Sequence, residues 1–308
     1  MIANFFNQSK PINFLVLLFT GLLIFSFTIA FHIYFENRIY SAVQIAFNLS
    51  LFFLLLFFHN FLTTKNKLTK NNTYGLYIFI LLFAIFPESI TNMKLMLSNF
   101  FLFFAYRRIY SLHSNLDTGS KIFDSGLWIG VAFIFYNWSI LFLLLSAAAL
   151  FLFKRLKWNY YFMLIIGFIT PIFLYFTYLV YADQQGTFQE LFNFEFSFNY
   201  FNYNEFPLLI PTSVILVFSI WAIYPTLMKS RNAKQKYKAS YKLLVLHLVL
   251  ALAIGIVAPI KDGSEFLFYF FPFSIIFATY IQINQDNWFK EVVMFVFLGL
   301  ALANFIIY

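Results

Sequence analysis

Residues 74–106 read YGLYIFILLFAIFPESITNMKLMLSNFFLFFAY, an apolar stretch that Pro87 and Glu88 break near its middle. At about 1.5 Å per residue, the whole stretch would form about 50 Å of helix. Two full crossings of a membrane core about 30 Å thick need about 60 Å. We therefore expect a helical hairpin whose turn, with Glu88, stays below the outer membrane surface.

A second apolar stretch, residues 122–153, is interrupted in the same way around Asn137. Its part from 125 to 153 would give about 44 Å of helix, again too little for two full crossings. Non-helical backbone at membrane depth is stable only where protein covers it or water reaches it. The two short hairpins therefore predict a recessed, partly hydrated cavity that opens outward.

Unbroken apolar runs of about 20 residues predict further membrane spans. They lie near residues 12–35, 39–62, 160–182, 208–228, 242–260, 265–283 and 288–308. With the two hairpins they give an all-α, polytopic transmembrane bundle of about 11 segments, in one integral membrane domain over residues 1–308. The composition agrees, because 62% of the residues are hydrophobic and 10% are charged, against about 25% charged in soluble domains.

The Lys and Arg residues predict the orientation, since cytoplasmic loops carry an excess of both. With the N-terminus inside, all of the 20 basic residues except Arg38, Lys94 and Lys261 lie on the cytoplasmic side. We expect a bacterial inner-membrane protein with a cytoplasmic N-terminus and a periplasmic C-terminus. The net charge of +8 is then a topology signal, and we expect no nucleic-acid partner. The basic cluster over 229–242 either sets topology or contacts anionic membrane lipids.

The longest connection between predicted spans is the external loop over residues 183–207. It is aromatic and acidic and contains no Lys or Arg. Its alternating aromatic and polar residues predict an amphipathic segment that lies on the outer membrane surface.

Candidate chemistry lies where external charges meet the predicted cavity. Glu88 is the sharpest candidate, because a carboxylate within the bilayer needs a partner or water. Lys94 is the nearest available cation, and the alternative is that Glu88 only caps a helix. The other acids and cations lie in two short external turns, and the alternatives for them are a solvated ion pair and a helix cap. These turns contain Glu36 and Arg38, and Lys261 and Asp262.

We therefore take Glu36, Glu88 and Asp262 as candidate catalytic acids or bases. Candidate groups for holding a lipid phosphate are cations, as that chemistry requires: Arg38, Lys94, Lys261, Arg107 and Arg108. The last two are adjacent in a cytoplasmic turn, where they either bind a lipid phosphate or anchor the end of a helix.

No sequence motif indicates a cofactor or a metal. The four His residues show no pair at metal-ligand spacing, and the chain has no Cys. His59 and His247 are expected near the membrane interfaces. Nucleotide-binding loops and the HExxH motif are also missing, which argues against an ATP-driven pump and a membrane metalloprotease. We expect neither a metal nor a cofactor.

Two segments resemble the GT-C superfamily of membrane glycosyltransferases. Residues 105–142 join a basic turn to a hairpin with Gly126 and Gly130, and residues 259–274 combine a basic residue, aromatic residues and Pro272. The whole chain also resembles an uncharacterised inner-membrane protein family of Flavobacteria and other Bacteroidota, which begins near the pattern FFxxSKP, here residues 5–11.

The GT-C resemblance implies a polyprenyl-phosphate-linked sugar as substrate and a role in envelope glycan metabolism. Members of that superfamily carry a catalytic acid, usually Asp, in a large first external loop, whereas this chain has only Glu36 to Arg38 there. Either the activity is lost or Glu36 is the base. The alternatives are a non-catalytic subunit that binds other inner-membrane proteins and a transporter or flippase that uses the same cavity.

Overall fold

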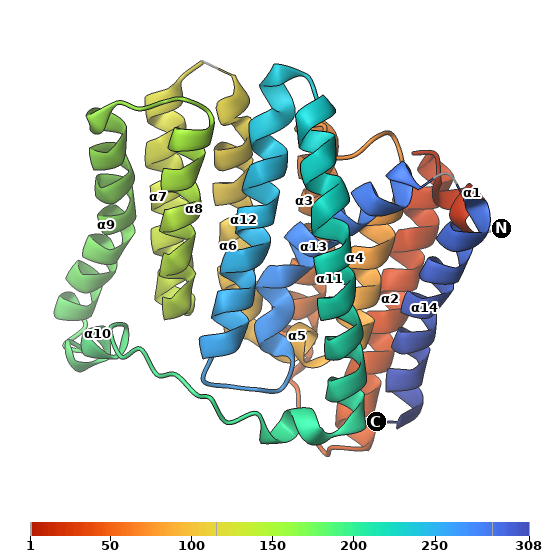
Figure 1. The fold of residues 1–308 in the computed structure, drawn as a ribbon. Coiled ribbons are helices and arrows are strands. Elements are labelled where there is room, and N and C mark those ends of the chain that lie inside the picture. The colour runs from red at the N-terminus through yellow and green to blue at the C-terminus, as the bar shows by residue number, and fades with distance from the viewer. Residues whose placement is uncertain (1, 115, 285, 308) are drawn as a thin grey trace. The chain divides into compact units, whose positions relative to one another are not determined.

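The computed structural model describes residues 2–114, 116–284 and 286–307, and within them every regular element is a helix (Figure 1). The long helices, in chain order, are α2 (Pro11–Tyr34), α3 (Ala42–Lys65), α6 (Met93–Tyr110), α7 (Thr118–Phe135), α9 (Trp158–Tyr181), α11 (Phe206–Asn232), α12 (Gln235–Val257), α13 (Leu267–Ile283) and α14 (Asn287–Ile307). The shorter elements are α1 (Ile2–Phe6), α4 (Tyr74–Ile85), α5 (Glu88–Thr91), η1 (Ser111–His113), η2 (Asn137–Leu141), α8 (Phe142–Leu152), α10 (Gly186–Glu190), η3 (Phe201–Asn204) and η4 (Ser264–Phe266).

Seven helical segments of the described chain are long and apolar enough to cross a membrane. They are Pro11–Tyr34, Ala42–Lys65, Trp158–Tyr181, Phe206–Arg231, Tyr237–Val257, Ser264–Ile283 and Asn287–Asn304. The chain thus has the helices of a membrane protein. The count of about 11 expected from the sequence goes beyond these seven, since α4, α6, α7 and α8 are the arms of the two hairpins.

The helices break where the sequence predicts the two hairpin turns. α4 ends at Ile85 and α5 begins at Glu88, while α7 ends at Phe135 and η2 begins at Asn137. Pro87 cannot donate a backbone hydrogen bond, which explains the first break. At the second, Asn137 Nδ2 donates to the backbone of Asn193 at 2.7 Å. The external loop therefore supplies partners for the turn of the second hairpin.

The described chain divides into two compact units. Unit 1 contains the described parts of residues 1–96, 199–228 and 261–308, and unit 2 contains residues 97–198 and 229–260. The external loop is shared: residues 183–198 belong to unit 2 and the remainder to unit 1. This loop carries α10 and η3 and no strand among its described residues.

The core of unit 1 is the pair α4 and α13. Every residue of α4 is buried, and α13 is buried over most of its length. His59 of α3 lies in this core, 1% exposed, with Nε2 at 2.8 Å from Ser274 Oγ. The face of α3 that carries His59 packs against Phe79 of α4 and Phe271 of α13, so the ring is covered by protein.

α4 is much shorter than the neighbouring helix α2, so it ends before α2 does. The two begin at the same end of unit 1, since Ser9 N donates to Asn71 O just before both start. α2 has 24 residues and α4 has 12, so at about 1.5 Å per residue they extend about 36 and about 18 Å. Glu88 therefore lies recessed from the end of α2.

Unit 2 is held together by close contact between α7 and α9. A Cβ added at Gly126 would lie 2.3 Å from Leu164 O, and one at Gly167 would lie 2.3 Å from Phe123 O. A Cβ added at Gly130 would lie 2.4 Å from Phe168 O. Gly126 and Gly130 are four residues apart, a spacing that lets the backbones of two helices approach closely.

His247 of α12 is also buried, with an exposed fraction of 0%. Its ring lies 4.3 Å from that of Tyr106, and its Nδ1 is 3.1 Å from the Tyr110 hydroxyl. His247 thus lies on the face of α12 that packs against α6.

Candidate functional site

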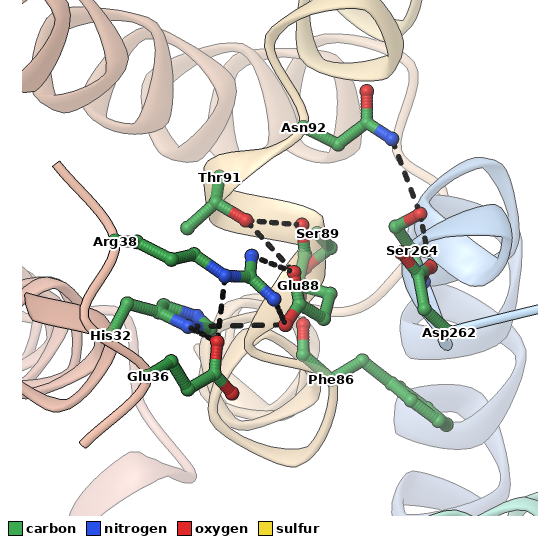
Figure 2. A network of polar contacts seen from close by, with 10 residues as sticks. All are labelled: His32, Glu36, Arg38, Phe86, Glu88, Ser89, Thr91, Asn92, Asp262 and Ser264. Atoms are coloured by element: carbon green, nitrogen blue, oxygen red, sulfur yellow. Dashed lines mark hydrogen bonds and ion pairs between the residues drawn. The ribbon is translucent and has the colours of Figure 1, made fainter. Parts of the chain in front are cut away.

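Three segments of unit 1 meet at the recessed end of α4. They are the chain that follows α2, the short helix α5, and the turn that precedes η4. The first of these turns back sharply, because Asn37 has a positive φ of 53° and Arg38 N donates to His32 O at 2.9 Å. This turn points the Arg38 side chain toward α5 (Figure 2).

An ion-pair network joins the first two segments (Figure 2). Arg38 Nη1 and Nη2 each donate to one oxygen of Glu88 at 2.8 Å, and Arg38 Nε lies 2.6 Å from Glu36 Oε2. Thr91 Oγ1 also donates to Glu88 Oε2 at 3.1 Å. Burial disfavours the charged guanidinium, but hydrogen bonding and the charge of Glu88 outweigh this and raise the pKa of Arg38. The partner of Glu88 is therefore Arg38 and not Lys94.

His32 completes the network from inside α2. It is 1% exposed, and its Nδ1 lies 2.8 Å from Glu36 Oε2 and 3.9 Å from Glu88 Oε1. Its Nε2 is buried without a hydrogen-bond partner among the described residues. The polar contacts of this ring are thus all on the side that faces the two carboxylates.

Asp262 approaches from the third segment. Its Oδ1 accepts hydrogen bonds from Ser264 N at 2.9 Å and from Ser264 Oγ at 2.6 Å. Asn92 Nδ2 donates to Ser264 Oγ at 3.4 Å and so connects this turn with α5 (Figure 2). Unlike Glu36 and Glu88, Asp262 forms no ion pair with a described residue.

These side chains line one open pocket with a volume of about 490 Å³. Its lining residues are Arg38, Ile39, Tyr40, Glu88, Thr91, Asn92 and Asp262. Two of the three predicted acids, Glu88 and Asp262, thus line the same pocket as Arg38. The third, Glu36, does not line the pocket but pairs with Arg38. Hydroxyl, amide, carboxylate and guanidinium groups give the pocket donors and acceptors for a highly polar ligand.

Lys261 lies outside the residues that line this pocket. It is 5% exposed, and its Nζ lies over the ring of Tyr200 at 4.9 Å from the ring centre. Burial lowers the pKa of Lys261, although the nearby charge of Glu265 opposes this. Lys261 does not line the pocket; it helps to hold the external loop, whose Asn202 Nδ2 donates to Lys261 O at 2.9 Å.

Glu265, which the sequence did not single out as a site residue, holds the same loop. It is 1% exposed and accepts hydrogen bonds from the Tyr203 hydroxyl at 2.6 Å and from Gly263 N at 2.8 Å. Burial and the charge of Glu265 raise the pKa of Tyr203 above its ordinary value. The turn that carries Asp262 is thereby bonded to the external loop on either side of Asp262, at Lys261 and at Glu265.

The remaining predicted cations lie outside the pocket. Lys94 is exposed on the first turn of α6. Arg107 and Arg108 occupy the last turn of α6, in unit 2, and Arg108 Nη2 pairs with Asp124 Oδ2 at 2.7 Å. The ion pair fits the reading of this turn as a helix anchor.

The sequence contains one signal for His32, which is the carboxylate four residues after it. His32 lies in the last turn of α2 and Glu36 lies two residues beyond the end of this helix, so their side chains can meet. The convergence of these two with Glu88 had no comparable signal, because it depends on how α2 and α4 pack.

A family profile described as "Family of unknown function (DUF6427)" matches residues 6–308. The chain belongs to this family. No curated protein and no solved structure matches it. The DUF6427 match covers both hairpins, both units and every residue of the pocket, so this pocket lies within the region that defines the family.

Proposed function

We propose that this DUF6427 protein is a bacterial inner-membrane protein that acts on a lipid-linked saccharide, with the pocket at Arg38, Glu88 and Asp262 as its headgroup site. The observation that carries the proposal is this convergence. Glu88 and Asp262 are far apart in the sequence, yet both line one recessed polar pocket beside a guanidinium. Recessed polar groups at membrane depth are costly and mark functional sites.

The proposed topology has about 11 membrane segments, with a cytoplasmic N-terminus and a periplasmic C-terminus. The seven long apolar helices and the two broken hairpins support this count. The distribution of basic residues supports the orientation. The pocket then opens toward the periplasm, where lipid-linked sugars are used.

The proposed reaction is glycosyl transfer of the GT-C type. Asp262 is the candidate base, because it is the predicted acid that lines the pocket without forming an ion pair. Its carboxylate would take the proton of an acceptor hydroxyl as that oxygen bonds to the anomeric carbon, and the lipid phosphate would leave with the electrons of the broken bond. Glu36 and Glu88 are less suited to this task, since both already interact with Arg38.

The hydrogen-bonding groups of Thr91 and Asn92 fit the saccharide part of such a substrate. Both side chains line the pocket next to Asp262, and sugar hydroxyls pair well with amide, hydroxyl and carboxylate groups. The phosphate would lie at Arg38, whose guanidinium has five N–H donors. Three of them are taken up by the contacts of Nε, Nη1 and Nη2 with Glu36 and Glu88.

A non-catalytic role in a membrane complex is the second candidate. The ion-pair network favours it, because two carboxylates held by one guanidinium also form a stable structural junction. In that case Asp262 serves only to cap the turn before η4 through its bonds with Ser264.

A lipid profile of a deletion strain separates the two candidates. We expect the strain to accumulate a lipid-linked saccharide, wild-type protein to remove it, and Asp262→Asn protein to leave it in place at equal abundance in the membrane. Glu190→Asn, at an exposed external position, is the matched control and should restore the wild-type profile. Full restoration by Asp262→Asn would exclude the catalytic role and favour the structural one.

A further inference from the structure

The pocket and its ion-pair network hold more negative than positive charge. Three carboxylates, those of Glu36, Glu88 and Asp262, surround one guanidinium, that of Arg38. Lys261 does not compensate, since its ammonium lies over the Tyr200 ring. A phosphate would add further negative charge, so a lipid phosphate in this pocket needs an additional cation.

Three of the side chains have the geometry of metal ligands. One ligand atom each from His32, Glu36 and Glu88 can be chosen so that all three lie within 4.8 Å of one another. His32 Nδ1 lies 2.8 Å from Glu36 Oε2 and 3.9 Å from Glu88 Oε1. Ligand atoms around a metal with bonds of about 2.0–2.2 Å lie roughly 3 to 4 Å apart. Small side-chain shifts would therefore complete the set.

The imidazole distinguishes this set from an ordinary acidic cluster. His32 is 1% exposed, and its Nδ1 points at both carboxylates (Figure 2), while Nε2 has no partner among the described residues. A buried ring with one nitrogen directed at two carboxylates is already oriented as a metal ligand, and little entropy is lost on binding. The ring comes from the last turn of α2, and a helix is a more rigid support for a site than a loop.

Arg38 occupies the place where a metal would neutralise the carboxylates. It contacts both Glu36 and Glu88, yet its side chain is 41% exposed and comes from the non-helical segment after α2. The guanidinium can therefore swing toward the open pocket without disturbing a helix. In the structure Arg38 serves as the cation of the network.

We propose that His32, Glu36 and Glu88 form a site for a divalent transition-metal ion that exchanges with the Arg38 guanidinium. When the metal binds, the carboxylates are neutralised by two positive charges instead of one, and Arg38 becomes available to the pocket. The assignment of the freed Arg38 to a lipid phosphate rests on the function proposed above. The metal site itself rests only on the three ligands.

The ligand chemistry selects the class of metal. One imidazole nitrogen with two carboxylate oxygens suits Zn²⁺ or Mn²⁺, whereas Mg²⁺ prefers oxygen ligands alone and keeps most of its water. The site would leave at least one position open for water or a phosphate oxygen, which is typical of catalytic metal sites.

Calorimetric titration of the full chain in detergent tests the site directly. After removal of metal with a chelator, Zn²⁺ and Mn²⁺ are titrated separately, and we expect one equivalent to bind and Mg²⁺ to bind at least tenfold more weakly. Glu36→Gln should lower the affinity at least tenfold. Glu190→Gln, which removes an exposed carboxylate elsewhere, should leave it unchanged.

Arg38→Gln gives the decisive result. It shows whether the guanidinium competes with the metal for Glu36 and Glu88 or only pairs with these carboxylates. If the guanidinium and the metal compete, this variant binds metal at least tenfold more tightly than wild type, and the metal restores its thermal stability. If Arg38→Gln gains no affinity, exchange between the metal and the guanidinium is excluded. If Glu36→Gln binds like wild type, or if wild type shows no saturable binding, the metal site itself is excluded.

Electron paramagnetic resonance of Mn²⁺ on wild-type protein covers the case in which the variants do not fold. A nitrogen coupling from the imidazole of His32 is expected, and a spectrum with oxygen ligands only would exclude the site. These titrations contain no lipid. A failure of metal binding thus leaves the headgroup proposal standing, and a failure of the lipid profile leaves the metal site standing.

Discussion

The guanidinium of Arg38 and the carboxylate of Glu88 form a two-point ion pair, with Nη1–Oε2 and Nη2–Oε1 distances of 2.8 Å each. The pair joins the chain after α2 to the break after α4, two segments that are 50 residues apart. A planar pair of this kind fixes both distance and orientation. It therefore determines the geometry of one wall of the pocket.

Arg38→Met should destabilise unit 1, because it leaves the 7%-exposed Glu88 without its cation. Breaking a fully buried pair costs about 3–5 kcal/mol, and the water at the half-exposed Arg38 reduces this to about 1–3 kcal/mol. Thermal unfolding in detergent, without added metal, measures the loss. Lys94→Met removes an exposed cation nearby and should stay within about 0.5 kcal/mol; equal effects of the two would contradict the pairing.

Gly126→Ala should destabilise unit 2. The new Cβ would lie 2.3 Å from the backbone oxygen of Leu164, so α7 and α9 must separate, and overpacking costs about 1–3 kcal/mol. Gly299→Ala is the matched control in α14, where nothing lies within 4 Å of the added atom, and Ala there favours the helix by up to about 1 kcal/mol. Limited proteolysis or thermal unfolding should show that Gly126→Ala is less stable than Gly299→Ala. The opposite order would refute the close approach of α7 and α9.

Stability should fall at alkaline pH through Tyr203. Burial, followed by the charge of Glu265, raises the pKa of Tyr203 above its ordinary value of 10.0. The neutral phenol is thus favoured in the folded state, and this contribution is fully present below about pH 10 and is lost as the pH rises further. The stability difference between wild type and Tyr203→Phe should therefore shrink as the pH rises from about 10 to about 11. A constant difference would show that the pKa of Tyr203 is the same in the folded and unfolded states.

Headgroup binding should depend on the residues that line the pocket and not on Lys94 or Lys261. Asn92→Leu removes polar groups next to Asp262 and should lower the occupancy of copurified lipid about tenfold, equivalent to about 1.4 kcal/mol. Lys94→Gln should change it less than twofold. Native mass spectrometry of the protein in mild detergent gives the occupancies. A larger loss of lipid occupancy in Lys94→Gln than in Asn92→Leu would show that Lys94 contributes to headgroup binding.

The sequence was sufficient for the helical class and for both hairpin turns, because each depends on local information. Apolar length predicts a span, Pro87 predicts a break, and Gly126 predicts a close approach, without knowledge of partners. The depth of Glu88 below the outer membrane surface, which follows from the length of this stretch compared with the thickness of a membrane, stays a prediction.

The pairing of charges could not be predicted in this way. Lys94 is closer to Glu88 in sequence than Arg38 is, yet the turn at Asn37 directs Arg38 toward α5, while Lys94 stays exposed on α6. Similarly, no local pattern shows whether a His side chain will be covered by other helices. The burial of His59 depends on α4 and α13, which the sequence alone does not place beside α3.

Photo-crosslinking from position 39 tests the headgroup proposal most directly. Ile39 lines the pocket and is 96% exposed, so a benzophenone side chain there should be tolerated and should reach a bound headgroup. We predict capture of a saccharide-bearing lipid phosphate in native membranes, and none of it from position 181, where Tyr181 is 90% exposed outside the pocket. Capture of the same bulk phospholipids from both positions, with no saccharide-bearing lipid from position 39, would contradict the account.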